Sequence, residues 1–169
     1  MNMIVAYCKN RGIGIGNTLP WHIHNELKYF KNLTSSNGND CVIMGKKTWL
    51  SLPKKPLQNR TNIILSSSLT KDELPKNTLL FNNKETLVKY ISKKKHTPWI
   101  IGGESIYNSF ISSNDLEYIY VTFINEKYDC DTFFPEIPNN FKCQTKSSYK
   151  ISNNVFYRFE IYKKFRNMR

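Results

Sequence analysis

Apolar residues along the chain form short continuous runs, and segments with helical spacing lie between them. The runs that we interpret as buried strands are MIVAYC (3–8), CVIMG (41–45), NIILSS (62–67), TLLF (78–81), PWIIGG (98–103) and LEYIYVTFI (116–124). Helical spacing follows at 25–34, 46–52, 84–95 and 103–111. Continuous apolar strands that alternate with helices are typical of a mostly parallel sheet covered on both faces.

The last apolar segment has a different pattern. In VFYRFEIYKK (155–164), Val155, Tyr157 and Phe159 alternate with Phe156 and Arg158. Strict alternation predicts a half-exposed antiparallel strand at one edge of the sheet. The chain has 169 residues and shows neither an internal repeat nor a linker-like segment. We therefore expect one α/β domain over residues 1–169.

The first predicted helix has an unusual polar residue. At about 100° per residue, Leu27, Phe30 and Leu33 share one side of the helix, and Glu26 falls between Leu27 and Leu33. Burial of an unpaired charge costs several kcal/mol or more. Either the helix assignment is wrong, or Glu26 reaches water or a lysine, or it has a partner that the chain does not supply.

Composition narrows the class of protein. Apolar residues make up 40 % of the chain, and no apolar run approaches the roughly 20 residues of a membrane span. The four cysteines form no CxxC pair, which favours a reduced, cytoplasmic compartment. The net charge of +12 suits an anionic ligand or a nucleic acid. Because the lysines are spread along the whole chain, we do not expect nucleic acid to be the main partner.

Two strand ends carry candidate phosphate-binding residues. Gly45-Lys46-Lys47-Thr48 and Gly102-Gly103 each connect a strand to a helix, and the two junctions would suit the two ends of a dinucleotide. The first junction is not a P-loop, because Asp40 stands where that motif has its first glycine. His22 and His24 have no third ligand at zinc spacing, so no metal site is expected.

These pieces together resemble a known family. The segments IVA, GIG, LPWHIHNELKYFK, VIMGKKTW, PL-x-x-R-x-NIILS, WIIGGESIY, YVT and DTFFPEI follow one another along the chain. In these segments, over nearly its whole length, the chain resembles dihydrofolate reductase. The resemblance implies a central, mostly parallel eight-stranded sheet with an antiparallel C-terminal edge strand and four flanking helices.

The same resemblance implies an activity. A monomeric cytoplasmic enzyme would reduce 7,8-dihydrofolate, and possibly folate, to 5,6,7,8-tetrahydrofolate with NADPH. Hydride would pass to C6 of the pterin and a proton to N5, and antifolate inhibitors would bind the same pocket. Glu26 would accept hydrogen bonds from the pterin N3–H and 2-amino group, Thr122 would orient Glu26, and Trp21 would help to hold the water that protonates N5.

Two further groups of residues follow from the resemblance. Arg60 would bind the glutamate α-carboxylate of the substrate as a bidentate partner. The substrate-binding residues would be Ile4, Val5, Ala6, Leu27, Phe30, Leu52, Leu57, Arg60, Ile101 and Tyr107. The cofactor-binding residues would be Ala6, Ile13, Gly14, Gly45, Lys46, Lys47, Thr48, Leu65, Ser66, Ser67, Gly102, Gly103, Glu104, Ser105 and Ile106.

The resemblance also predicts two backbone features. We expect a cis peptide bond between Gly102 and Gly103, and a loop from Lys9 to Ile23 that closes over the nicotinamide. Glu104 departs from the family pattern, and we expect its side chain to turn away from the pyrophosphate. Two alternatives stay open, a pyrimidine reductase of the same fold and an RNA-binding protein. Glu26 and Arg60 favour a folate over a pyrimidine.

Overall fold

The structure is a computed structural model that describes residues 1–36 and 38–165. Its strands are β1 (Asn2–Cys8), β2 (Gly12–Gly14), β3 (Asp40–Gly45), β4 (Thr61–Leu65), β5 (Thr78–Phe81), β6 (Thr97–Gly102), β7 (Tyr118–Ile124), β8 (Thr132–Phe133), β9 (Phe141–Lys146), β10 (Lys150–Ser152) and β11 (Val155–Lys164). Its helices are α1 (His24–Thr34), α2 (Lys46–Ser51), α3 (Lys84–Ser92), α4 (Glu104–Phe110) and the short 3₁₀ turn η1 (Lys71–Glu73).

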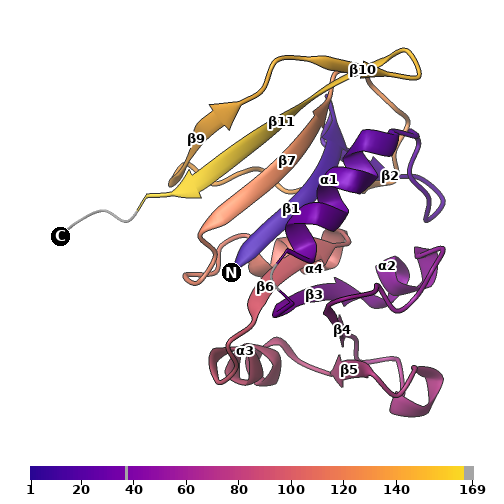
Figure 1. Cartoon of the computed structure of the whole chain (residues 1–169), viewed down its shortest axis with the longest axis vertical. Coiled ribbons are helices and arrows are strands. Elements are labelled where there is room, and N and C mark those ends of the chain that lie inside the picture. Colours follow the sequence, from indigo (N-terminus) through magenta and orange to yellow (C-terminus); the bar gives the residue numbers. More distant parts are fainter. Residues whose placement is uncertain (37, 166–169) are drawn as a thin grey trace.

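The main sheet has the predicted, mostly parallel arrangement (Figure 1). Eight strands follow one another in the order β10-β11-β7-β1-β6-β3-β4-β5, and β9 pairs with β11 beside this path. The contacts from β7 through β1, β6, β3 and β4 to β5 are parallel, whereas β11 runs antiparallel to β7. The predicted α/β class and the antiparallel C-terminal strand are therefore confirmed.

Helices cover both faces of the sheet. On one face, Leu87 of α3 and Phe110 of α4 pack with Met3 and Ile43 in a buried cluster. On the other face, Trp49 of α2 lies in a cluster with Ile4 and Val42, and Phe30 and Leu33 of α1 pack against it. Alternate residues of β1 thus enter opposite cores, as the two-residue period of a strand requires.

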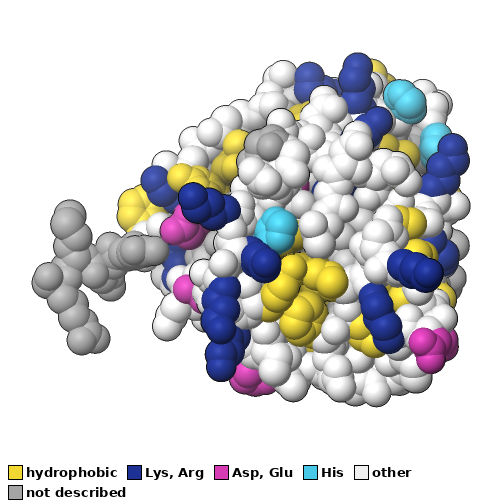
Figure 2. Space-filling model, turned by 60° about the horizontal axis from the view of Figure 1, so that its bottom comes forward, with side chains coloured by type: hydrophobic (Ala, Val, Ile, Leu, Met, Phe, Trp, Pro, Cys, Tyr) yellow, Lys and Arg dark blue, Asp and Glu magenta, His cyan; other side chains and the backbone are white. Residues whose placement is uncertain are grey.

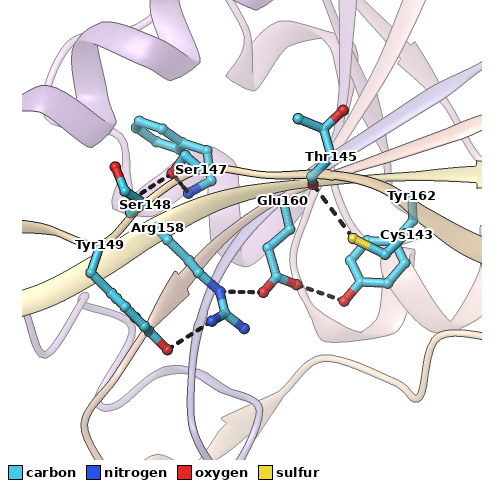
Figure 3. A network of polar contacts seen from close by, with 9 residues as sticks. Cys143, Thr145, Ser147, Ser148, Tyr149, Arg158, Glu160 and Tyr162 are labelled. Atoms are coloured by element: carbon cyan, nitrogen blue, oxygen red, sulfur yellow. Dashed lines mark hydrogen bonds and ion pairs between the residues drawn. The ribbon is translucent and has the colours of Figure 1, made fainter.

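The C-terminal strand also carries a buried polar network (Figure 3). Glu160 on β11 is buried, and its carboxylate accepts hydrogen bonds from Arg158 Nε at 2.6 Å and from the Tyr162 hydroxyl at 2.6 Å. Arg158 also donates to the Tyr149 hydroxyl at 2.9 Å, which ties β11 to the segment before β10. A charge in this position is stabilised only because a counter-ion and hydrogen bonds accompany it.

Some elements differ from the sequence-based expectation. β9, β10 and the small antiparallel sheet of β2 with β8 were not predicted. β9 has a single buried residue, Phe141, so it lacks the apolar alternation of a strand. Helix α3 ends at Ser92 rather than at position 95, because the lysines that follow it form no apolar face. Among the described residues, the helices are too short or too polar to cross a membrane.

Candidate active site

The site lies at the carboxyl ends of neighbouring parallel strands. Met44 at the end of β3 pairs with Gly102 at the end of β6, and Gly45 pairs with Leu65 at the end of β4. The predicted junctions at Gly45 and at Gly102 therefore lie next to each other. In open parallel sheets this edge is where ligands bind.

Glu26 is buried on the inner side of α1. Its residue is only 7 % exposed, and burial raises the pKa of its carboxyl group from 4.5 to about 7. Within residues 1–36 and 38–165, no hydrogen bond or ion pair of this carboxylate is found. The helix assignment is thus confirmed, and Glu26 reaches neither a lysine of the described chain nor open solvent. An acid without a protein partner lies where the helix faces the sheet.

Trp21 has an unsatisfied donor in the same region. Its indole is buried among Cys8, Ile23 and Tyr157, and its Nε1–H has no hydrogen-bond partner in the described part of the chain. Thr122 is also buried, on β7, where it pairs with Ala6 of β1. The hydrogen bond expected from Thr122 to Glu26 is not among those formed by the described residues. A buried donor without a partner, such as the Trp21 Nε1–H, points to a bound ligand or water.

Tyr107 links two strands that border the site. Its hydroxyl donates to the carbonyl oxygens of Ile4 at 2.8 Å and of Ile101 at 2.9 Å, and burial keeps the pKa of this hydroxyl above its usual value. A carbonyl oxygen has two lone pairs, so both carbonyls can still accept from a ligand. Val5 differs from its neighbours, because its side chain packs in the opposite core with Met3.

Arg60 is held at the far end of α1. Its Nη1 donates to Thr34 Oγ1, its Nε donates to the Gln58 carbonyl at 2.9 Å, and the guanidinium lies 5.9 Å from the centre of the Phe30 ring. Phe30, Leu52 and Leu57 pack against the same core cluster. Leu27 is largely exposed. A basic group thus stands beside an apolar wall, which suits a ligand with an aromatic ring and a carboxylate.

Lys46 reaches the end of β4. Its ammonium group lies 3.3 Å from Ser68 Oγ, and the hydroxyls of Ser66 and Ser68 are 3.4 Å apart. Ser67, the expected neighbour of Ser66, is exposed. Ser68 was not predicted, although it stands in the same run of three serines. A lysine and two hydroxyls make a donor set that suits a phosphate monoester.

The glycine junctions are closely packed. The Gly102–Gly103 peptide is cis, as expected. A Cβ atom at Gly102 would lie 2.9 Å from the Tyr107 ring, and one at Gly103 would lie 3.2 Å from Thr48 Oγ1. A Cβ atom at Gly45 would lie 3.0 Å from the side chain of Ile106. Ser105 is exposed and Glu104 is half-buried in the first turn of α4, so the outward turn of Glu104 stays a prediction.

The loop from Lys9 to Ile23 contacts a segment that the sequence reasoning missed. Gly16 N–H donates to the Asp131 carboxylate at 2.8 Å, and Asp131 N–H donates to the Gly14 carbonyl at 3.0 Å. Ile13 is half-buried beside them and packs against the core. Asp131 belongs to the segment DTFFPEI, but nothing local indicates that this aspartate holds a distant loop.

A second missed residue supports Arg60. Asn62 is buried in β4; its side chain accepts from Leu57 N–H at 2.9 Å and donates to the Leu57 carbonyl at 2.8 Å and the Arg60 carbonyl at 3.1 Å. The sequence contained one sign of this role, because Asn62 is an amide in the otherwise apolar start of the run NIILSS. Buried amides need partners, and here the partners belong to the loop that carries Arg60.

Comparisons with known proteins agree with this arrangement. The sequence model of the family described as Dihydrofolate reductase matches residues 1–164. The chain is 43 % identical over 149 residues to "Dihydrofolate reductase" of Drosophila melanogaster, covering 83 % of this chain and 82 % of that protein. It is 36 % identical over 183 residues to "Dihydrofolate reductase" of Gallus gallus, covering 97 % of this chain and 96 % of that protein. It is 39 % identical over 156 residues to "Bifunctional dihydrofolate reductase-thymidylate synthase" of Plasmodium berghei, covering 85 % of this chain and 27 % of that protein.

Proposed function

We propose roles for individual residues on the premise that this chain belongs to the dihydrofolate reductase family. The chain is an NADPH-dependent oxidoreductase that reduces 7,8-dihydrofolate to 5,6,7,8-tetrahydrofolate, and it binds antifolates in the same pocket. The observation that carries our assignment of residues is the buried Glu26 carboxylate without a protein partner. We further propose that the enzyme acts as a cytoplasmic monomer.

The residues at the ends of β3 and β4 fit NADPH. The ammonium group of Lys46 and the hydroxyls of Ser66 and Ser68 supply a cation and two donors for the 2′-phosphate. Lys47 and Thr48 would meet the other phosphates, and the absence of side chains at Gly102 and Gly103 lets the backbone approach them. When bound, NADPH supplies the hydride that is added to the substrate.

Glu26 recognises and activates the pterin. Its two oxygens accept hydrogen bonds from the pterin N3–H and 2-amino group, which gives the buried carboxylate the partners it lacks. The carboxylate stabilises the positive charge that the ring gains when N5 is protonated, in a site of low dielectric. Burial raises the pKa of Glu26 to about 7 in the ligand-free protein. The positive charge of the bound pterin lowers this pKa again, because it stabilises the carboxylate form.

Trp21 and Thr122 act through water and through Glu26. The free Nε1–H of Trp21 is a donor for the water that delivers the proton to N5. Thr122 lies on β7 beside Ala6 and offers its hydroxyl to Glu26 once the ligand is bound. The carbonyls of Ile4 and Ile101 accept from the pterin edge, and Tyr107 fixes their separation.

Arg60 binds the tail of the substrate. The benzoyl ring lies against Phe30, Leu52 and Leu57, and Leu27 covers it from the solvent side. The guanidinium forms a paired hydrogen bond with the α-carboxylate, a geometry that lysine cannot supply. Thr34 and Asn62 position Arg60 for this contact.

The test is the oxidation of NADPH by dihydrofolate, followed by the loss of NADPH absorbance. We expect Glu26→Gln, which keeps the shape and removes the charge, to lower kcat/KM by roughly 10²–10³. Near-normal turnover of the variant at neutral pH would refute the role of Glu26. If the wild-type chain binds NADPH and leaves dihydrofolate unreduced, the pyrimidine reductase becomes the better assignment.

A further inference from the structure

Cys8 and Cys130 lie against each other although they are far apart in the sequence. Cys8 ends β1 and is fully buried, whereas Cys130 lies just before β8 and is half-buried. A Cβ atom at Gly12 would lie 2.3 Å from the sulfur of Cys130 and 3.1 Å from the sulfur of Cys8. The Cys8 thiol donates to Asn10 Oδ1 at 2.8 Å, and Cys130 packs against the buried cluster that contains Cys8. Both sulfurs therefore border the same short stretch of backbone.

The segment around Cys130 holds the loop from Lys9 to Ile23. Asp131, the next residue, donates to the Gly14 carbonyl and accepts from Gly16 N–H at 2.8 Å. Phe134 N–H donates to the Arg11 carbonyl at 2.8 Å. Cys130 thus lies at the start of the segment that keeps residues 11–16 in place.

We propose that Cys8 and Cys130 form a reversible disulfide that ties the end of β1 to the segment holding this loop. The oxidant is a low-molecular-weight disulfide, such as oxidised glutathione. The half-buried Cys130 sulfur loses its proton and attacks that disulfide, and one glutathione leaves as a thiol. The Cys8 sulfur then attacks Cys130, loses its proton and releases the second glutathione. Two protein thiols are oxidised and one small disulfide is reduced.

The bond changes how the loop moves. A disulfide is a covalent bond that joins two sulfurs at about 2.05 Å. Gly12 lies beside both sulfurs, so the cross-link fixes the base of the loop against β1. The segment 130–134 can then no longer move away from β1, so opening of the loop becomes rarer. This effect on the loop does not rest on the proposed function.

The experiment starts from the full chain, reduced and then treated with oxidised glutathione. After unfolding in an alkylating agent, we expect four alkylated cysteines in the reduced protein and two in the oxidised protein. Peptide mass mapping should assign the missing pair to Cys8 and Cys130. Amide hydrogen exchange at residues 12–18 should slow by about tenfold or more on oxidation and recover with dithiothreitol.

Cys143→Ser is the matched control, because Cys143 is exposed on β9, at the opposite side of β11 from β1. It should still lose two thiols on oxidation, whereas Cys130→Ser should lose none to an internal disulfide. The peptide map of the wild-type chain decides the matter even if Cys130→Ser folds poorly. Retention of all four thiols, or glutathione attached to Cys143 as the only product, would overturn the proposal. Exchange and thiol counts stay informative if dihydrofolate proves to be the wrong substrate.

Discussion

At the scale of single residues, the buried carboxylate of Glu26 lowers the free energy of unfolding above neutral pH. The folded protein holds the Glu26 proton more tightly than the unfolded chain, because its pKa is about 7 instead of 4.5. Stability from this group is complete below pH 4.5 and is lost as the pH rises to about 7. The loss amounts to about 3 kcal/mol. We expect Glu26→Gln to be more stable than wild type at pH 8 by about 2–3 kcal/mol, and nearly equal at pH 4.5.

Urea unfolding of the ligand-free protein at the two pH values measures this difference. Glu85→Gln is the control, because Glu85 is an exposed carboxylate in the first turn of α3. It should not become more stable than wild type at pH 8 by a comparable amount. An equal difference between wild type and Glu26→Gln at both pH values would mean that burial of the charge is not the cause.

Arg60 offers a second test on the same scale. We expect Arg60→Leu to weaken dihydrofolate binding by about 10- to 100-fold, the worth of a hydrogen bond to a charged group. A truncated dihydropterin without the glutamate should lose much less. Steady-state kinetics with both substrates measure the difference, and NADPH affinity serves as the control for folding. Equal losses for the two substrates would show that Arg60 does not hold the tail.

Single residues were predictable from the sequence only where the local pattern carried the information. The burial of Glu26 followed from its place on the same side of the helix as Phe30 and Leu33, which pack against the core. Leu27, at the edge of that side, is nevertheless largely exposed.

Asn62 was missed although its partners lie within five residues, because an amide in an apolar strand does not say which carbonyls it will bind. Ser68 and Asp131 were missed, because their partners Lys46 and Gly16 come from distant segments. The contact between Cys8 and Cys130 was missed for the same reason, and spacing alone had argued against any pair.

At the scale of elements, the turn from β6 into α4 depends on glycine. Gly102 has a φ of +112°, and an added Cβ would meet the Tyr107 ring at 2.9 Å. We expect Gly102→Ala to lower the free energy of unfolding by about 2–4 kcal/mol, since it adds backbone strain and displaces Tyr107. Urea unfolding measures the change.

Gly38→Ala is the control. Gly38 also has a positive φ, of +73°, but a Cβ atom there would have no other atom within 4 Å. This substitution should cost only about 1 kcal/mol. If both variants lose a similar free energy of unfolding, the contact between Gly102 and the Tyr107 ring does not contribute to the loss.

Elements were predictable where they are buried. The strands of the parallel sheet are continuous apolar runs, and helix α1 shows clear periodicity, so their bounds were close to those observed. β9 and β10 are mostly exposed, and β2 and β8 are only three and two residues long. Such strands are specified by the β11 and loop partners that they pair with rather than by their own pattern.

At the scale of the whole molecule, the order of apolar runs was sufficient to predict the fold class, and the charge was not sufficient to predict a partner. Figure 2 shows lysine and arginine side chains at several separate places on the visible face, with few acidic side chains among them. On this face the basic side chains form no continuous row along which a nucleic acid could bind. A net charge of +12 spread in this way produces a general positive field, which attracts any small anion.

Both substrates of this enzyme are anions, so the field should speed their encounter with the protein. We expect the association rate of NADPH to fall by on the order of tenfold between 10 and 300 mM salt, because the screening length shrinks from about 30 Å to well under 10 Å. Stopped-flow fluorescence measures that rate, and a neutral dihydropterin is the control that should respond little. An association rate of NADPH that does not change with salt would contradict steering. If RNA binding instead shows high affinity with a steep dependence on salt, the positive charge serves a second partner.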